Sequence, residues 1–412
     1  MKISMRTSVL RTGVAALALG FGIAAASAAE KADVMHWWTS GGEAAAVHVF
    51  AQDYDKAGGN WFNDAVAGGD AARAAAINRI VGGKPPTASQ FNTGKQFDDL
   101  VNNHLLRNLD ADAKAGGWEK DIPPMFMKAV SRNGHIYAIP VNIHGQNWLW
   151  YNPAVLKKAG VSVPKTYDEM LAELPKIKAA GMVPLAASTQ TWQESILFNA
   201  ILASEAGQSE FIKIWSGKDP AAVQGPVFAK AVTIFKKMKE FTDPGANNRN
   251  WNDATAMVIQ GKAAFQVMGD WAKGEFGNAH QTAGKEFGCT VLGPAYLAGG
   301  DVFVFPKNKD PEQAKAQDLL VKVMMSKDTQ LGFAAKKGSI PIRQDVSLKT
   351  LDACAQQGHA LMQNPANQTP SVDMIASPSV IGGANDVINK FWNDPKMSDK
   401  DFIAKFAAAL KG

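Results

Sequence analysis

The sequence has few cysteines, little excess charge and no run of like charge. Its 412 residues include two cysteines, and 43 lysines and arginines stand against 38 aspartates and glutamates. Because Lys and Arg form no cluster, we expect neither a nucleic-acid partner nor attachment to a membrane surface. Hydrophobic residues make up 46% of the chain, which is enough for well-formed cores. The length is typical of roughly two or three folding units.

The sequence also lacks the local motifs of most catalytic, cofactor and metal sites. None of its Gly-Lys pairs completes a phosphate-binding loop, and H-E-x-x-H, C-x-x-C and G-x-S-x-G do not occur. The seven histidines are scattered, so we interpret each as a surface or core residue rather than a metal ligand. We therefore predict no catalytic residue, no cofactor and no metal site. A carboxylate pair for glycoside hydrolysis need only meet in space, which leaves a secreted glycoside hydrolase as one alternative.

Residues 1–28 have the pattern of a secretory signal peptide. Three basic residues precede the apolar run of residues 12–26, and small residues at 26–28 predict cleavage between Ala28 and Ala29. The apolar run is shorter than the roughly 20 residues of a membrane-spanning helix, and no cysteine follows it to carry a lipid. We therefore expect an exported protein. Loss of the leader leaves 40 basic against 38 acidic residues, and this near-neutral balance favours a neutral ligand.

Export would place the two cysteines, Cys289 and Cys354, in an oxidising compartment, where they can pair. A disulfide between them would close a loop of about 65 residues, worth about 4 kcal/mol in the chain-entropy model. Spacing does not fix disulfide geometry, so two buried free thiols are the alternative.

An alternation of strand and helix opens the mature chain. A short strand at 33–38 ends in a turn and is followed by a helix over 43–56; a second strand at 61–67 precedes a helix over 71–81. This alternation predicts a parallel sheet with helices on both faces. Further helices are expected at 153–159, 166–180, 194–207, 250–261, 270–279 and 311–327.

Three extended stretches, at 136–151, 299–306 and 338–343, are predicted to cross between two lobes; we call them the crossing segments. Neither lobe is then continuous in sequence. We expect an α/β protein in which lobe 1 contains residues 29–140 and 300–345, and lobe 2 contains residues 141–299 and 346–412. Each lobe is expected to be a mostly parallel sheet flanked by helices.

Tryptophan is unusually frequent, with eleven residues against five tyrosines. Trp37 and Trp38 follow one another at the end of a strand, so alternation sends one ring into the core and leaves the other at the rim. Ligands of open parallel sheets bind beyond this strand end, and Glu43 lies within one turn of it. A flat ring beside hydrogen-bonding groups suits a sugar, which has an apolar face and a rim of hydroxyls. Core packing is the expected role of Trp61, Trp118, Trp215 and Trp392.

Several stretches of the mature chain, in order, resemble the glucose-binding proteins of bacterial ABC importers. They are HWWTSGGE (36–43), AVAGGD (65–70), PVNIHGQNWLW (140–150), TDPG (242–245), WNDATAMVIQGKAAFQVMGDWAKGEF (251–276) and KKGSIPIR (336–343). The resemblance implies a two-lobed periplasmic binding fold of type II, similar to maltose-binding protein, with sugar enclosed between the lobes. It also implies that the two cysteines form a disulfide. The sugar-binding residues that it implies are Trp37, Trp38, Glu43, Trp251, Trp271, Asp301 and Lys337.

Two positions depart from that family. Asn92, which we also expect to contact sugar, stands where the family has a lysine, and Ser371, Val372 and Asp373 stand where it has a histidine. We therefore expect a neutral sugar other than glucose as readily as glucose itself: a related hexose, a pentose, a polyol or a small glycoside.

The resemblance implies a monomeric, non-enzymatic receptor that delivers sugar to the permease subunits of an ABC importer with a cytoplasmic ATPase. A second alternative to this receptor is a sugar-sensing partner of a membrane chemoreceptor or kinase.

Overall fold

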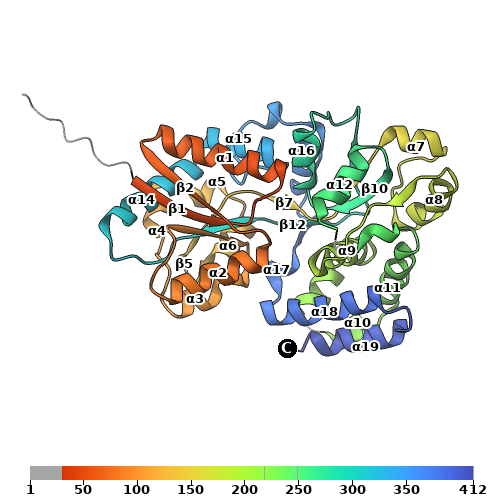
Figure 1. The fold of residues 1–412 in the computed structure, drawn as a ribbon. Coiled ribbons are helices and arrows are strands. Elements are labelled where there is room, and N and C mark those ends of the chain that lie inside the picture. The colour runs from red at the N-terminus through yellow and green to blue at the C-terminus, as the bar shows by residue number, and fades with distance from the viewer. Residues whose placement is uncertain (1–29, 218, 248, 412) are drawn as a thin grey trace, which may run out of the picture.

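The structure is a computed structural model that describes residues 30–217, 219–247 and 249–411. The predicted signal peptide and its cleavage site lie outside the described residues. Two lobes lie side by side, with β7 (His144–Gly145) and β12 (Tyr296–Gly299) between them (Figure 1). The two-lobed α/β fold is thus confirmed.

The first lobe is built on a five-stranded sheet with the order β2-β1-β3-β13-β6. β1 pairs in parallel with β2 and β3, whereas β13 is antiparallel to both β3 and β6. Its strands are β1 (Glu30–His36), β2 (Gly59–Ala65), β3 (Ala88–Asn92), β6 (Ala138–Pro140) and β13 (Asp301–Val304). A small hairpin of β4 (Ser131–Arg132) and β5 (His135–Ile136) lies outside this sheet.

The second lobe contains a four-stranded sheet with the order β11-β8-β10-β9 and a three-stranded sheet with the order β14-β12-β7. β8 is antiparallel to β10 and β11, and β9 is parallel to β10. The remaining strands are β8 (Trp148–Tyr151), β9 (Val183–Leu185), β10 (Ala263–Met268), β11 (Gly288–Val291) and β14 (Gln368–Pro370).

The sheets are mixed, so the prediction of mostly parallel sheets was wrong. The antiparallel pairs arise where the chain changes lobes. β6 carries the chain out of the first lobe and β13 brings it back, so the two strands run in opposite directions side by side. β8, which enters the second lobe, meets β10 in the same way.

Helices cover the sheets of both lobes (Figure 1). Around the first sheet are α1 (Gly41–Lys56), α2 (Gly69–Val81), η1 (Lys95–Phe97), α3 (Asp98–Asn102), α4 (Asp110–Gly116), α5 (Trp118–Asp121), α6 (Pro124–Val130), α14 (Pro311–Met324) and α15 (Lys327–Lys337). The other helices are α7 (Pro153–Ala159), α8 (Tyr167–Ala179), α9 (Thr191–Gly217), α10 (Pro220–Val223), α11 (Pro226–Lys239), η2 (Pro244–Ala246), α12 (Trp251–Ile259), α13 (Ala272–Asn278), η3 (Leu348–Thr350), α16 (Ala353–Met362), α17 (Val372–Ile375), α18 (Pro378–Asn393) and α19 (Asp399–Ala409).

The first helix shows how local sequence fixes an element that the site uses. Ser40 caps α1, because its hydroxyl accepts from the backbone N–H of Glu43; the hydroxyl also donates to the Glu43 carboxylate. Val47, Phe50 and Tyr54 recur at helical spacing and are buried. Phe50 stacks on Phe333 of α15 with ring centroids 4.2 Å apart. The start of α1 is therefore held in place at the strand end where Trp37 emerges.

Cys289 of β11 and Cys354 of α16 form a disulfide, with Cα atoms 6.1 Å apart. The predicted pairing is confirmed, and the alternative of two free thiols was wrong. The bridge ties α16 to the four-stranded sheet of the second lobe.

The three crossing segments lie side by side. The backbone N–H of Val141 donates to the Asp301 carbonyl at 3.0 Å, and that of Ile143 donates to the Ile340 carbonyl at 2.8 Å. The first crossing segment thus bonds to both of the others. Within the described residues, no helix combines the length and the hydrophobicity needed to cross a membrane.

Candidate functional site

Trp37 and Trp38 follow β1 and point in different directions, as strand alternation predicts. Trp38 is 1% exposed and packs among Phe50, Phe303 and Phe333, with ring centroids 5.2–6.3 Å away. Trp37 is half-buried, and its backbone N–H donates to the side-chain oxygen of Gln90 at 3.1 Å. Trp38 is therefore a core residue here, and the ring of Trp37 is the one left at the rim.

A buried ion pair joins the start of α1 to the end of α15. Lys337 Nζ donates to Glu43 Oε1 at 3.0 Å, and the two side chains are 3% and 9% exposed. The Lys337 ammonium also lies 5.6 Å from the ring centroid of Trp38 and 5.9 Å from that of Trp271. Because burial of a charged pair costs about as much as the pair regains, its presence is weak evidence for a stabilising role. It is better understood as part of a polar site.

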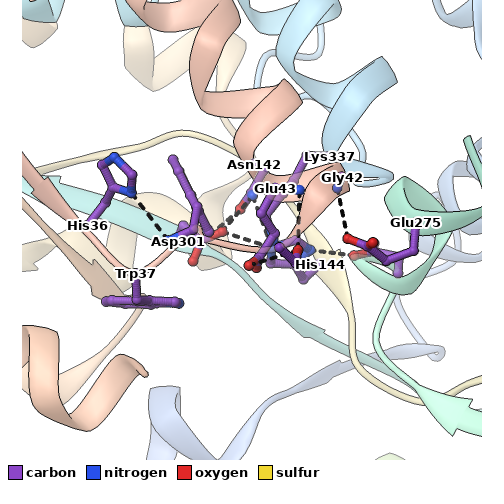
Figure 2. Close-up of polar contacts among 12 residues, drawn as sticks. His36, Trp37, Gly42, Glu43, Asn142, His144, Glu275, Asp301 and Lys337 are labelled. Atoms are coloured by element: carbon purple, nitrogen blue, oxygen red, sulfur yellow. Dashed lines mark hydrogen bonds and ion pairs between the residues drawn. The ribbon is translucent and has the colours of Figure 1, made fainter. Parts of the chain in front are cut away.

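Asp301 begins β13 and faces the same cluster (Figure 2). One carboxylate oxygen accepts from Gln90 Nε2 at 2.8 Å, and the other accepts from Asn142 Nδ2 and His144 Nε2, each at 2.8 Å. Burial alone would raise the pKa of Asp301, but the charge and the hydrogen bond of His144 outweigh burial and lower the pKa to about 2. Asp301 is thus an anion that is held by three donors.

His144 lies between Asp301 and a second carboxylate, that of Asp270, which follows β10. Its Nδ1 contacts Asp270 Oδ1 and its Nε2 contacts Asp301 Oδ2. Burial would lower the pKa of His144, but the charges of the two carboxylates raise it to about 9. The edge of the imidazole meets Trp271 with ring centroids 5.1 Å apart.

The second lobe contributes three partly buried tryptophan rings. Trp271 directly precedes α13 and lies 6.2 Å, centroid to centroid, from Trp192 in the first turn of α9. Trp251 begins α12, which packs against α13. Trp271, with Trp192 beside it, offers apolar surface next to His144.

A second cluster of polar side chains lies at the carboxyl end of β3, where Asn92 and Gln96 face Asp373 of α17. Gln96 Nε2 donates to one Asp373 oxygen at 3.0 Å and Asn92 Nδ2 to the other at 3.5 Å. Burial raises the pKa of Asp373, and the Arg73 charge only partly opposes this. Gly94, at φ 112°, lets the two backbones touch, because a Cβ there would lie 2.1 Å from the Asp373 carbonyl oxygen.

A further contact joins α1 to α13. The backbone N–H of Gly42 donates to Glu275 Oε1 at 2.8 Å, as Figure 2 shows. A Cβ on Gly42 would lie 2.4 Å from the carbonyl carbon of Gly274, so the helices meet backbone to backbone. The first turn of α1, with its positive dipole end, therefore accepts a carboxylate from the other side of the interface.

The structure brings most of the predicted sugar-binding residues together. Lys337 contacts Glu43, Trp38 and Trp271, and Asn92 is opposite Asp301 in the pairing of β3 with β13. The backbone N–H of Trp37 donates to the Gln90 side chain, which in turn donates to Asp301. Trp251 is linked to the cluster only through the packing of α12 on α13. Whether any of these residues contacts sugar stays a prediction.

Sequence reasoning missed Gln90, Asn142, His144, Trp192, Asp270 and Glu275. Four of them lie inside stretches that carry the family resemblance: Asn142 and His144 in PVNIHGQNWLW, and Asp270 and Glu275 in GDWAKGEF. The interpretation of His144 as an ordinary core histidine overlooked that its two carboxylate partners come from distant parts of the chain. Among the described residues, no three His, Cys, Asp or Glu side chains gather closely enough to hold a metal ion.

Two lobes, three crossing segments and an interface lined by tryptophan and hydrogen-bonding side chains define the class of hinged ligand receptors. The chain belongs to the bacterial extracellular solute-binding protein family, whose model matches residues 50–369.

Two relatives are described as probable sugar-binding periplasmic proteins. That of Mesorhizobium japonicum is 37% identical over 96% of this chain and 97% of its own length. That of Rhizobium meliloti is 35% identical over 99% of both chains. Among solved structures, a chitin oligosaccharide binding protein has a TM-score of 0.80 and covers 93% of this chain and 99% of its own, at 17% identity. This likeness extends the fold assignment to almost the whole described chain.

Proposed function

We propose that this protein is the exported receptor of an ABC importer and binds a neutral sugar between its two lobes. The observation that carries the proposal is the link of Trp271 in one lobe to Glu43 of the other through Lys337, and to Asp301 through His144. The sugar-binding names of the two bacterial relatives support this choice of ligand.

The chemistry of the interface suits a sugar. Trp37 and Trp271 are half-buried rings on which the C–H face of a pyranose or furanose can stack. Glu43, Asp301 and Asn92 supply acceptors, and Lys337 and Asn92 supply donors, for a rim of hydroxyl groups. The charged groups are already paired, so a neutral polyhydroxy ligand can join the network without leaving an unpaired ion.

The same electrostatics favour binding over glycoside hydrolysis. A hydrolase needs one carboxyl whose pKa is raised so that it can protonate the leaving group. His144 instead lowers the pKa of Asp301 to about 2, and Lys337 bonds directly to Glu43. Asp373, whose pKa burial does raise, is bonded to the side-chain amides of Asn92 and Gln96. Because neither Asp301 nor Glu43 can serve as its ionisable partner acid, we propose that the chain has no catalytic residue.

The rest of the proposal concerns export, partners and boundaries. Residues 1–28 direct the chain to the periplasm, where it acts as a monomer. Lobe 1 comprises residues 29–140 and 300–345, and lobe 2 comprises residues 141–299 and 346–412; closure of these lobes on sugar creates the surface that the permease subunits bind. The sheet membership of β13 in lobe 1 and of β8 to β11 in lobe 2 supports these boundaries.

A thermal-shift screen tests the proposal. Mature protein is mixed with D-glucose, D-galactose, D-xylose, L-arabinose, mannitol and maltose, and one neutral sugar is expected to stabilise it by about 2.7 kcal/mol at a hundredfold excess over Kd. Trp271→Ala should lower affinity for that sugar at least tenfold, since a lost stacking face is worth about 1–3 kcal/mol. Trp61→Ala, which changes a partly exposed ring beside Tyr54, is the matched control. If no sugar stabilises the wild type, the proposed function is wrong.

A further inference from the structure

His144 occupies an unusual position in the crossing segments. It is in β7, between β6 of the first sheet and β8 of the second, and it is buried. Each of its ring nitrogens contacts a carboxylate: Nδ1 meets Asp270 and Nε2 meets Asp301. A neutral imidazole has only one N–H, so it could donate to only one of the two. Asn142 Nδ2 also lies 3.0 Å from Nε2. Donation to both carboxylates, when both are ionised, takes the two N–H groups of an imidazolium.

The two carboxylates are bonded to different parts of the first crossing segment. The backbone N–H of Gly145 donates to Asp270 Oδ2, and that of Asp270 donates to the Gly145 carbonyl, each at 2.9 Å. Asp270 thus moves with β7. Asp301 is tied instead to the residues that leave β6, because its N–H donates to Asn142 Oδ1 at 2.7 Å and its carbonyl accepts from Val141.

A rotation of the lobes about residues 141–145 would change the separation of Asp270 and Asp301. Among the residues that the structure describes, the side chain of His144 lies between these two carboxylates and bonds to both. Near it, Asn142 Nδ2 donates to the same Asp301 oxygen, so two donors converge on one acceptor. The imidazolium therefore has its full set of partners only while the two carboxylates face each other.

We propose that His144, as an imidazolium, is the positioning residue that ties Asp270 to Asp301 across the crossing segments and so sets Asp301 in place when the lobes close on sugar. This inference rests on the proposed function for its link to sugar. The tie itself is a property of the chain and can be measured without any ligand.

The charges around His144 determine the direction of its pH dependence. Asp270 after β10 and Asp301 on β13 face the ring, and Lys337 of α15 acts on Asp301. The ring of Trp271 contacts His144, and the buried Tyr296 interacts electrostatically with Asp270. The two carboxylates raise the pKa of His144 from 6.5 to about 9. The tie is thus complete at neutral pH and is lost as the pH rises through about 9.

The first measurement needs no sugar. Ring-labelled histidine is followed by NMR from pH 5 to 10 in wild type and in His144→Gln, which identifies the signal. We expect an imidazolium with both ring N–H protons that titrates near pH 9. Titration at or below 6.5 would overturn the proposal, whatever the outcome of the sugar screen.

The second measurement links the tie to binding. Calorimetric titration with the sugars of the screen is expected to give a constant wild-type Kd from pH 6 to 8 and a Kd about tenfold weaker at pH 10. His144→Gln should weaken binding at least tenfold at pH 7 and flatten this profile. His48→Gln, the same change at an exposed position of α1, should behave as wild type. Equal profiles for wild type and His144→Gln would refute the proposal.

A double variant guards against misfolding. His144→Gln alone leaves Asp270 buried without its cation, a costly state. His144→Gln with Asp270→Asn removes that charge, and this variant should recover the melting temperature while it keeps the flat pH profile. If the double variant instead showed the wild-type dependence of Kd on pH, His144 would act only by occupying space in the protein interior. If no sugar in the screen binds to wild type, the proposed function fails while the NMR titration still decides the tie.

Discussion

Gly42→Ala is expected to weaken sugar binding while it leaves the unliganded protein folded. Gly42 is in the first turn of α1, and its Cβ would lie 2.4 Å from the carbonyl carbon, 2.7 Å from the carbonyl oxygen of Gly274 and 2.8 Å from the Glu275 nitrogen. All three atoms belong to the backbone of α13. Ordinary carbon contacts begin near 3.5 Å, so the two helices must separate by about 1 Å.

That displacement acts on the contact between the lobes, because α1 and α13 belong to different lobes. Alanine favours a helix over glycine by about 1 kcal/mol in a helix interior, so the fold of α1 itself is not harmed. The shift also stretches the hydrogen bond from the Gly42 N–H to Glu275, which is 2.8 Å long. Loss of one charge-assisted bond together with the lost packing is worth about 1.5–3 kcal/mol, or at least a tenfold rise in Kd.

Calorimetric titration gives the affinity, and small-angle scattering with and without sugar gives the extent of closure. Gly277→Ala is the matched control, because Gly277 is on the same α13 and a Cβ there meets nothing within 4 Å. We expect Gly42→Ala to bind at least tenfold more weakly than Gly277→Ala, with similar melting temperatures for the two unliganded variants. Equal affinities would show that the contact of α1 with α13 is not part of the bound state.

Two further outcomes follow from the disulfide and from Asp301. Cys289→Ser is expected to lower the free energy of unfolding by about 4 kcal/mol, measured by urea titration, because it opens a loop of about 65 residues; a free energy of unfolding within about 0.5 kcal/mol of wild type would contradict this. Burial of Asp301 is outweighed by His144, which lowers its pKa to about 2, so its contribution to stability is present above pH 4 and lost as the pH falls through 2. Asp301→Asn should remove that part of the acid sensitivity in denaturant titrations at pH 2 to 5, and an unchanged acid profile would refute the assignment.

Local signals predicted many elements well, because their causes lie within a few residues. α7 spans 153–159 as expected, since Asn152 caps it and Gly160, at φ 65°, ends it. The helix expected to end at Gly207 does break there, at φ 66° and ψ 177°, although a second helix follows at once. The directions of the strands were not predictable in the same way. β13 pairs with β3 across roughly 200 residues, and no local pattern sets the direction of that pairing.

In the candidate site too, features set by neighbouring residues were predictable and features set by distant residues were not. The burial of Trp38 and the partial exposure of Trp37 follow from strand alternation alone. The charge on His144 does not, because it depends on Asp270 and Asp301, which are 126 and 157 residues away. A lone histidine is ordinary in sequence, and only the folded chain shows the two carboxylates beside it.

The place of β13 in the first sheet has a consequence for how the chain acquires its structure. β13 lies between β3 and β6, yet its residues follow those of β6 by about 160 positions. The first sheet therefore cannot be completed until most of the polypeptide has been synthesised. If the chain is exported in an extended form, as we propose, this delay is useful, because its earliest segments cannot close into a finished lobe before the second crossing segment has arrived.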